Sequence, residues 1–345
     1  MAALSPITRY KLRKLIKYGL VTVAAAAVFM LFSGEGGKGY FAAWALLGIW
    51  TGVLEEFLFG RRFRSLAIPL QFLGKAVAVN LLTMAFIAFA FLINSENVLP
   101  LGDVGPRDVV AARAFYRIIL QVMVVTSIAI LVVQVEELMG RRLFTGFMLG
   151  RYERPVDEER VVLCIDLVGS TALNERLGDL RYFRFLNTTH SLMTDAVLHN
   201  EAEIHKYIGD EVIFTWTMRG GIRHLNCLDL FFDIEERIAE HEVELLREFG
   251  VVPRFRGAVH GGRVITAQVG HIKRAIDFSG DTMNTVSRLL NRSKEMKAGI
   301  LVSSELLERM PDAAERFRFG PELELPVKGK KRSVQAREVE RIKRG

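Results

Sequence analysis

The chain has 345 residues, of which half are hydrophobic and a quarter charged, and its formal net charge is +7 at pH 7. This length leaves room for two or three domains. Its two isolated cysteines, Cys164 and Cys227, supply neither a disulfide framework nor a zinc site. Long apolar runs crowd the first 150 residues and basic residues flank them. This pattern favours a membrane as partner, and no nucleic acid is expected, because aromatic and basic residues do not interleave.

Four apolar stretches predict a membrane domain over residues 1–135. Each is close to the ~20 residues that cross a bilayer as a helix, and they cover about 18–33, 40–59, 70–93 and 115–135. No cleavable signal peptide is expected, since the basic N-terminus leads into the first stretch without a cleavage site. Lys and Arg gather before the first stretch, between the second and third, and after the fourth. The positive-inside rule therefore predicts a multi-pass cell-membrane protein with both termini in the cytoplasm.

Charged residues inside these stretches allow two interpretations. Lys75 lies in the third stretch and the pair Glu55-Glu56 in the second. Charges in a bilayer are costly, so they could form a sensor or ion site. In the plainer interpretation, Lys75 extends to the cytoplasmic surface and the glutamates lie near the end of their span.

A connector is expected over residues 136–157. Apolar residues recur at close to helical spacing through 136–153, which predicts a continuation of the last membrane helix. The segment is either a passive stalk or a dimerising connector that transmits a signal. Pro155 ends it.

From residue 158 to 345 the pattern predicts an α+β domain. An apolar strand at 161–166 precedes a helix over 172–199, and a hairpin pairs Ala202–Tyr207 with Val212–Trp216. The next predicted elements are a helix over 222–249, strands over Arg254–His260, Val264–Val269 and Ala275–Phe278, and a helix over 282–296. This β-α-β-β-α-β order is the split-βαβ, ferredoxin-like plan.

The first chemical signal is a carboxylate where the first strand ends. Asp166 is followed by Leu-Val-Gly169-Ser170-Thr171, and Thr171 is a plausible cap for the next helix. Backbone amides at a helix N-terminus suit phosphate, and a neighbouring carboxylate suits the Mg²⁺ that accompanies phosphate. Taken alone, the same residues fit ordinary turn chemistry.

Two further motifs follow along the chain. His205-Lys206-Tyr-Ile-Gly209-Asp210 lies at the expected hairpin tip. The segment from Asp277 to Arg288 contains Gly280-Asp281 and then Asn284 and Arg288, four residues apart and therefore on one helix face.

In order and spacing, residues 158–340 resemble the catalytic domain of class III nucleotidyl cyclases, the adenylate and guanylate cyclase family. The resemblance implies that Asp166 and Asp210 hold two divalent cations, Mg²⁺ or Mn²⁺. It also implies that Lys206 and Asp277 read adenine, that Asn284 orients the ribose, and that Arg288 stabilises the pentacoordinate phosphorus. Gly169, Ser170 and Thr171 would contact the substrate beside the metals. Lys330 resembles a phosphate-contacting lysine of the family, although a basic turn is an equal explanation.

The resemblance further implies a homodimer with shared sites. In the family, the metal aspartates come from one subunit and the other four residues from its partner, and this chain carries all six. Departures are small: the family often has an aromatic residue where Ser170 stands, and usually no glutamate at position 211. The expected protein is a membrane-bound adenylate cyclase that converts ATP to 3′,5′-cyclic AMP and pyrophosphate.

Three alternatives remain open from the sequence. A guanylate cyclase is disfavoured by the Lys206/Asp277 pair, because guanine presents the opposite hydrogen-bond pattern. A catalytically silent receptor that uses the fold to dimerise typically lacks one of the six positions, and all six are present. An ion channel or transporter is weakly supported, since the four apolar stretches have no evident internal repeat.

Overall fold

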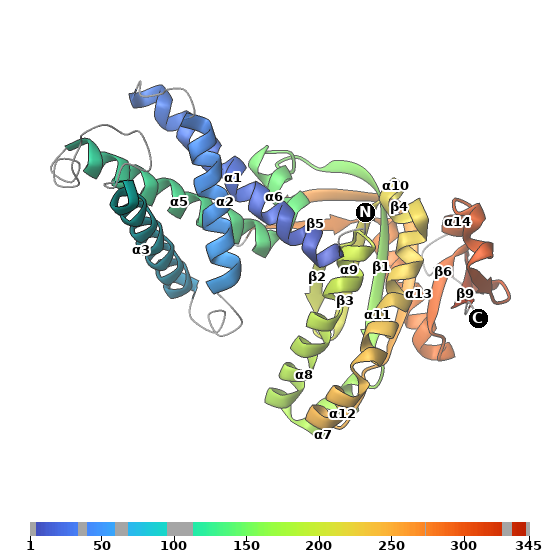
Figure 1. The fold of residues 1–345 in the computed structure, drawn as a ribbon. Coiled ribbons are helices and arrows are strands. Elements are labelled where there is room, and N and C mark those ends of the chain that lie inside the picture. Colours follow the sequence, from blue (N-terminus) through green and yellow to red (C-terminus); the bar gives the residue numbers. More distant parts are fainter. Residues whose placement is uncertain are drawn as a thin grey trace. The chain divides into compact units, whose positions relative to one another are not determined.

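The computed structural model describes residues 5–33, 40–58, 68–94, 113–272, 274–325 and 333–342. Packing contacts divide the chain into two compact units, Met1–Arg141 and Arg142–Gly345. We call them the N-terminal unit and the C-terminal unit and describe each by itself (Figure 1).

The described part of the N-terminal unit consists of long helices. They are α1 (Pro6–Ser33), α2 (Tyr40–Leu58), α3 (Ile68–Asn94) and α5 (Arg113–Met139). Among the described residues, two stretches, Pro6–Leu31 and Ile119–Met139, are long and apolar enough to cross a membrane, and Leu70–Ala85 is a shorter apolar stretch. Two helices support membrane association only weakly, and the arrangement with four spans stays a prediction.

Helices α1 and α2 approach closely where small residues meet. A Cβ atom added to Gly48 would lie 2.7 Å from the Cα atom of Gly19. At the same crossing, Thr22 Oγ1 donates a hydrogen bond to the carbonyl oxygen of Trp44 at 2.7 Å. Small residues and hydroxyl groups of this kind hold apolar helices together when the hydrophobic effect between them is weak.

The charges inside the predicted spans pair with one another. Glu55 is 4% exposed, and its carboxylate contacts Lys14 Nζ at 2.8 Å, Lys75 Nζ at 2.7 Å and the Tyr18 hydroxyl at 3.0 Å. A buried carboxylate with three donors is electrostatically compensated. The cluster therefore links α1, α2 and α3 and accounts for Lys75 as a structural partner of Glu55.

The connector is not the continuous helix predicted for residues 136–153. Helix α5 ends at Met139, Gly140 adopts a left-handed φ of +82°, and α6 runs from Arg141 to Met148. Glycine enters this conformation without the steric cost that other residues meet, which explains why the helix breaks there. After α6, the buried Tyr152 ring packs so tightly on Gly146 that no side chain fits at that position.

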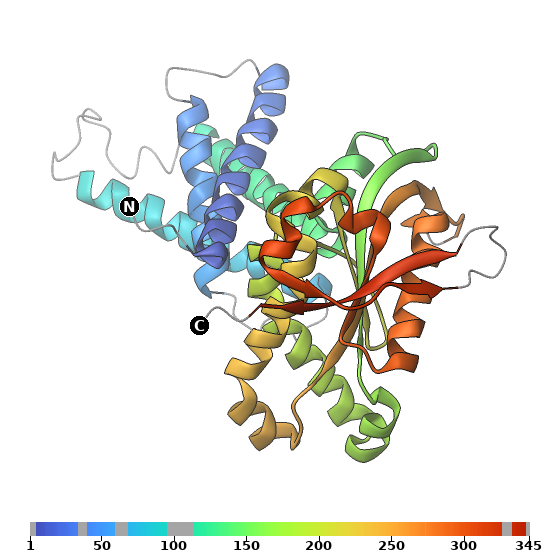
Figure 2. The ribbon, with the colours of Figure 1, turned by 90° about the vertical axis from the view of Figure 1, so that its right-hand side faces the viewer.

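A twisted sheet forms the centre of the C-terminal unit (Figures 1 and 2). Its main path has the order β2-β3-β1-β4-β6-β9-β7, with β5 paired to β4 and β8 to β9. The strands are β1 (Val156–Leu167), β2 (Glu203–Ile208), β3 (Glu211–Thr217), β4 (Phe255–Val269), β5 (Ala275–Ser279), β6 (Ile300–Ser303), β7 (Phe317–Phe319), β8 (Leu323–Leu325) and β9 (Val334–Arg341).

Helical segments join these strands. They are α7 (Ser170–Leu177), α8 (Asp179–Leu192), α9 (Thr194–His199), α10 (Met218–Ile222), η2 (Arg223–Leu225), α11 (Asn226–Glu240), α12 (Glu242–Phe249), α13 (Asp281–Met296), α14 (Ser304–Leu307) and η3 (Pro311–Glu315). The β-α-β-β-α-β order predicted from the sequence is present, and β1 pairs antiparallel with both β3 and β4.

The sheet is covered on both faces, and β1 shows why. Val161, Leu163 and Ile165 belong to the larger apolar core, which also contains residues of α8, α9 and α11. Val162 and Cys164 belong to the second core with Val286, Leu289 and Leu290 of α13. Because successive strand residues point to opposite faces, a continuous apolar run fills both cores. Figure 2 shows α11 in yellow and α13 in orange on the two sides of the sheet.

Several predicted boundaries are wrong in informative ways. The helix predicted over 172–199 is three helices, divided at Gly178, which has a φ of +74°, and again at Met193. The helix predicted over 222–249 is likewise divided. The two strands predicted over Arg254–His260 and Val264–Val269 form the single strand β4, because backbone pairing with β1 and β5 continues through the glycines between them.

Candidate active site

Two aspartates meet where β1 ends beside the β2–β3 turn. Asp166 is the penultimate residue of β1, and Ile165 pairs with Val212 of β3. Asp210 lies in the turn between β2 and β3, where Gly209 has a φ of +62°. The antiparallel pairing therefore carries Asp210 to the end of β1, beside Asp166.

The electrostatics of this corner disfavour negative charge. Burial raises the pKa of Asp166, the ion pair with Lys294 acts in the opposite direction, and the neighbouring Asp210 raises the pKa further. Lys294 Nζ lies 2.9 Å from Asp166 Oδ2. Burial also raises the pKa of Glu211. A nearby cation would relieve this cost, and the Lys294 ammonium is one such cation within the described residues.

One carboxylate oxygen beside Asp166 is left without a hydrogen-bond partner by the described residues. Asp210 Oδ2 is buried and has no hydrogen-bond partner in the part of the chain that the structure describes. Within that part, no group of three or more His, Cys, Asp or Glu side chains could enclose a metal ion by itself. Mg²⁺ is commonly held by one or two carboxylates together with substrate phosphates and water. Two aspartates with an unsatisfied buried oxygen fit that kind of metal.

The turn after β1 leads directly into a helix. Helix α7 begins at Ser170, and Gly169 precedes it with a left-handed φ of 72° and no side-chain cap. The prediction that Thr171 caps this helix is therefore wrong, because Thr171 already lies in its first turn. The amides of this turn follow Asp166 along the chain. Whether Gly169, Ser170 and Thr171 contact substrate stays a prediction.

A second cluster joins β2 to β5. Lys206 Nζ donates a hydrogen bond to Asp277 Oδ1 at 2.6 Å. Lys206 and Asp277 lie on strands that are not neighbours in the sheet. Their side chains are 37% and 38% exposed. Lys206 and Asp277 are thus brought together, as the resemblance implies, and both remain reachable from solvent.

Helix α13 carries the last pair of predicted residues. Asn284 is exposed and Arg288 is half-buried, four positions apart on one face. The same helix supplies Lys294 to Asp166. The predicted phosphate-contacting residue Lys330 lies outside the described residues.

Asp166 and Asp277 lie beside different ends of β4. Asp166 pairs with Arg256 near the start of β4, whereas Asp277 pairs with Ala267 near its end. One chain therefore places Asp166 and Asp277 at separate positions along the sheet, whereas the backbone of Lys206 pairs with Ile213, which in turn pairs with Cys164 of β1.

Sequence reasoning overlooked two residues that contact these clusters. His205 Nε2 lies 3.0 Å from Asp277 Oδ1, and Lys294 pairs with Asp166. His205 stands beside Lys206 in the motif, but alternation along a strand predicts opposite directions for neighbours. Lys294 follows Arg288 by six residues, a spacing that indicates no shared helix face.

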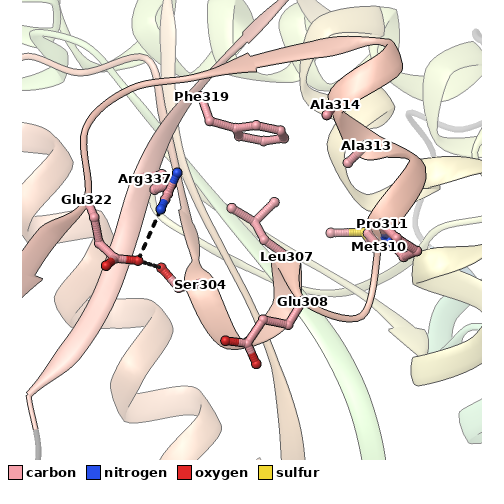
Figure 3. Close-up of a pocket in the computed structure, with 10 residues that line it drawn as sticks. All are labelled: Ser304, Leu307, Glu308, Met310, Pro311, Ala313, Ala314, Phe319, Glu322 and Arg337. Carbon is pink, nitrogen blue, oxygen red and sulfur yellow. Dashed lines mark hydrogen bonds and ion pairs between the residues drawn. The ribbon is translucent and has the colours of Figure 1, made fainter.

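A hollow of about 240 Å³ lies elsewhere in the C-terminal unit (Figure 3). Its walls include Leu307, Phe319 and the Glu322–Arg337 ion pair, in which the two side chains are 3.5 Å apart. It is lined by residues that include members of α14, η3, β7 and β9, and by none of the predicted site residues. The hollow is therefore separate from the candidate site.

A family comparison decides the classification. The sequence-family model described as the adenylate and guanylate cyclase catalytic domain matches residues 154–336, which is more than half of the chain. The chain belongs to the class III adenylate and guanylate cyclase family. Its matched region contains both clusters and helix α13, so the catalytic-domain fold is that of the family.

Relatives with known names agree with this classification. A protein named adenylate cyclase 2 from Rhizobium meliloti is 39% identical over 206 residues, which cover 59% of this chain and 57% of that protein. An adenylate cyclase from Anabaena cylindrica is 27% identical over 189 residues, covering 52% of this chain and 36% of that protein. The aligned region thus spans just over half of the first relative and about a third of the second.

A solved structure is similar in fold. The bacterial light-regulated adenylyl cyclase superposes with a TM-score of 0.52 at 18% identity, over 66% of each chain. At this identity the comparison supports the fold alone.

Proposed function

We propose that the chain is a membrane-bound adenylate cyclase that converts ATP to 3′,5′-cyclic AMP and pyrophosphate. The observation that carries this proposal is the Lys206–Asp277 pair, with Nζ and Oδ1 2.6 Å apart. Adenine offers an acceptor at N1 and a donor at its 6-amino group, which a lysine and an aspartate complement. The 39% identical relative named adenylate cyclase 2 supports the same substrate.

The aspartate pair supplies the metal site of this proposal. Asp166 and Asp210 would hold two divalent ions, Mg²⁺ or Mn²⁺, which when bound neutralise the triphosphate and lower the barrier to attack by the ribose 3′-hydroxyl. The unsatisfied Asp210 Oδ2 and the mutual repulsion of the two carboxylates support this assignment. The amides of Gly169, Ser170 and Thr171 would contact the phosphates beside them.

Helix α13 supplies the groups that act on the reacting centre. Arg288 would stabilise the charge that spreads over the phosphorus during displacement, for which a delocalised guanidinium is suited. Asn284 would orient the ribose so that its 3′-oxygen lies in line with the leaving pyrophosphate. Lys330 would contact the phosphates.

The complete site would form between two chains. Each chain holds Asp166 and Asp277 beside different ends of β4. A head-to-tail homodimer would bring the aspartates of one chain to the purine-reading pair, Asn284 and Arg288 of the other. Two such sites would form by symmetry.

We further propose the placement in the membrane. The membrane domain over residues 1–135 would cross the cell membrane with four helices, and the connector over 136–157 would follow. The catalytic domain over 158–345 and both termini would be cytoplasmic. The two apolar stretches Pro6–Leu31 and Ile119–Met139 support membrane association. The distribution of basic residues supports the orientation.

Turnover by the purified full-length protein tests the reaction. With ATP and Mg²⁺ or Mn²⁺, cyclic AMP should form, and Asp166→Ala or Asp210→Ala should nearly abolish it while the thermal unfolding midpoint stays near that of the native chain. Full activity in either variant would remove the metal assignment. Absence of cyclic AMP formation by the native protein would remove the proposed reaction.

A further inference from the structure

His205 contacts the purine-reading pair through an irregularity in β2. The pairing of β2 with β3 shifts between Ile204 and Lys206, so His205 is the extra residue of a β-bulge. Without a bulge, neighbouring strand residues point to opposite faces. The bulge lets His205 and Lys206, consecutive in sequence, both reach the carboxylate of Asp277.

The His205 ring is fixed by its surroundings. Its side chain is 2% exposed, and its plane stacks on the Phe278 ring with centroids 4.0 Å apart and an interplanar angle of 3°. Burial lowers the pKa of His205, which favours the neutral ring. Its Nδ1 is buried without a hydrogen-bond partner in the described part of the chain. The proton of the neutral ring therefore belongs on Nε2, which donates to Asp277.

All of the donors to Asp277 converge on one oxygen. Oδ1 accepts from His205 Nε2 at 3.0 Å, from Lys206 Nζ at 2.6 Å and from the backbone N–H of Phe278 at 2.8 Å. Within the described residues, no donor lies on Oδ2. The Asp277 carboxylate is thus held through Oδ1, and Oδ2 remains available to accept a hydrogen bond from a ligand.

We propose that His205 is a positioning residue for base recognition, which fixes Asp277 so that Oδ2 accepts from the 6-amino group of adenine. This inference rests on the proposed function and adds His205 to the residues that the proposed function uses. When ATP binds, Lys206 must donate a hydrogen bond to the adenine base. His205 and the Phe278 amide then keep Oδ1 occupied, so the carboxylate does not rotate to follow the lysine. A flexible carboxylate would lose much of this discrimination, because a mismatched base could be accommodated by rotation.

The test compares two substitutions that differ in one hydrogen bond. His205→Phe keeps an aromatic ring against Phe278 and removes the donor. His205→Gln offers a side-chain amide nitrogen at the reach of Nε2 and restores the donor. Binding of α,β-methylene-ATP and of the corresponding GTP analogue is measured on the full-length protein with Ca²⁺, alongside kcat and KM for ATP. Thermal unfolding midpoints identify any variant that fails to fold.

The two variants should differ in binding and not in chemistry. His205→Phe should weaken binding of the ATP analogue by about tenfold, since hydrogen bonds to charged groups contribute at that scale, and raise KM similarly. Its kcat should stay within about twofold, because no reacting atom is touched. His205→Gln should recover most of the affinity, and binding of the GTP analogue should change less than that of the ATP analogue in either variant.

Two outcomes would overturn the inference. Native affinity for the ATP analogue in a folded His205→Phe chain would show that the donor is unimportant. Equal weakening of both nucleotides, without recovery in His205→Gln, would reduce His205 to a structural part of β2. Failure of the proposed function is seen separately, as native binding of ATP without formation of cyclic AMP.

Discussion

Asp166 lies between opposing electrostatic influences. Burial and the neighbouring Asp210 disfavour the negative charge of the Asp166 carboxylate. Lys294 favours this charge, because its Nζ lies 2.9 Å from Asp166 Oδ2. The Lys294 side chain is 40% exposed and the Asp166 side chain 11%. Because the Lys294 side chain is partly exposed, we expect a bound divalent cation to displace its ammonium from Asp166.

Replacing Lys294 should therefore strengthen metal binding. In Lys294→Gln, a divalent ion no longer competes with a tethered ammonium, and the Mn²⁺ affinity of the full-length protein should rise by about fivefold. Electron paramagnetic resonance of free Mn²⁺, without nucleotide, measures it. Arg292→Gln is the matched control, because it removes one positive charge from the same helix but pairs with Glu295. Equal Mn²⁺ affinities in Lys294→Gln and Arg292→Gln would exclude direct competition between the Lys294 ammonium and the metal ion.

The two cysteines should be chemically inert in the folded chain. Burial raises the pKa of Cys227 to about 12 and that of Cys164 well above its usual range. At pH 8 the thiolate fraction of Cys227 would be about 10⁻⁴, and the thiolate is the reactive form. Neither thiol should react with iodoacetamide until denaturant unfolds the C-terminal unit. Rapid labelling of either cysteine in the native protein, detected by mass spectrometry, would contradict the packing.

At the scale of elements, local signals predicted much of the sheet and less of the helices. The apolar run ending at Asp166 is a strand because it fills two cores. Gly178 divides a predicted helix, since its positive φ favours glycine. The bulge at His205 and the Lys294–Asp166 contact depend on packing between distant segments. No residue spacing in the sequence predicts this bulge or this contact.

The N-terminal helices should depend on Glu55 more than on its neighbour. Glu55 is 4% exposed and contacts two lysines and a tyrosine, whereas the Glu56 side chain is 25% exposed and lies at the edge of the same cluster. Removing one member of a buried ion pair costs roughly 3–5 kcal/mol. Glu55→Gln should therefore lower the thermal midpoint of the detergent-solubilised protein clearly, and Glu56→Gln little. Similar midpoints for both would mean that the cluster contributes no net stability.

At the scale of the whole molecule, the proposed head-to-tail dimer with shared sites predicts complementation. Asp166→Ala and Arg288→Ala chains should each be inactive alone. In a mixed dimer both lesions fall in one site and the other site is intact. Random pairing at equal amounts should then give about a quarter of native activity, because half of the dimers are mixed and each has one working site.

Mixed dimers must be demonstrated for this comparison, for example by two affinity tags purified in sequence. Recovery in the doubly purified fraction supports shared sites. A doubly purified fraction without activity would show that each chain completes its own site, or that these residues serve another purpose.

Base choice tests the central claim most directly. Cyclic nucleotide formation from ATP and from GTP is compared for the native full-length protein and for Lys206→Glu combined with Asp277→Cys. Guanine would present its N1–H to the Lys206 donor and its carbonyl to the Asp277 acceptor, so the native protein should prefer ATP by about a hundredfold or more. The double variant should lose most ATP turnover and narrow or reverse that preference. Equal use of GTP by the native protein, or an unchanged preference in the double variant, would contradict the assignment of Lys206 and Asp277 to adenine.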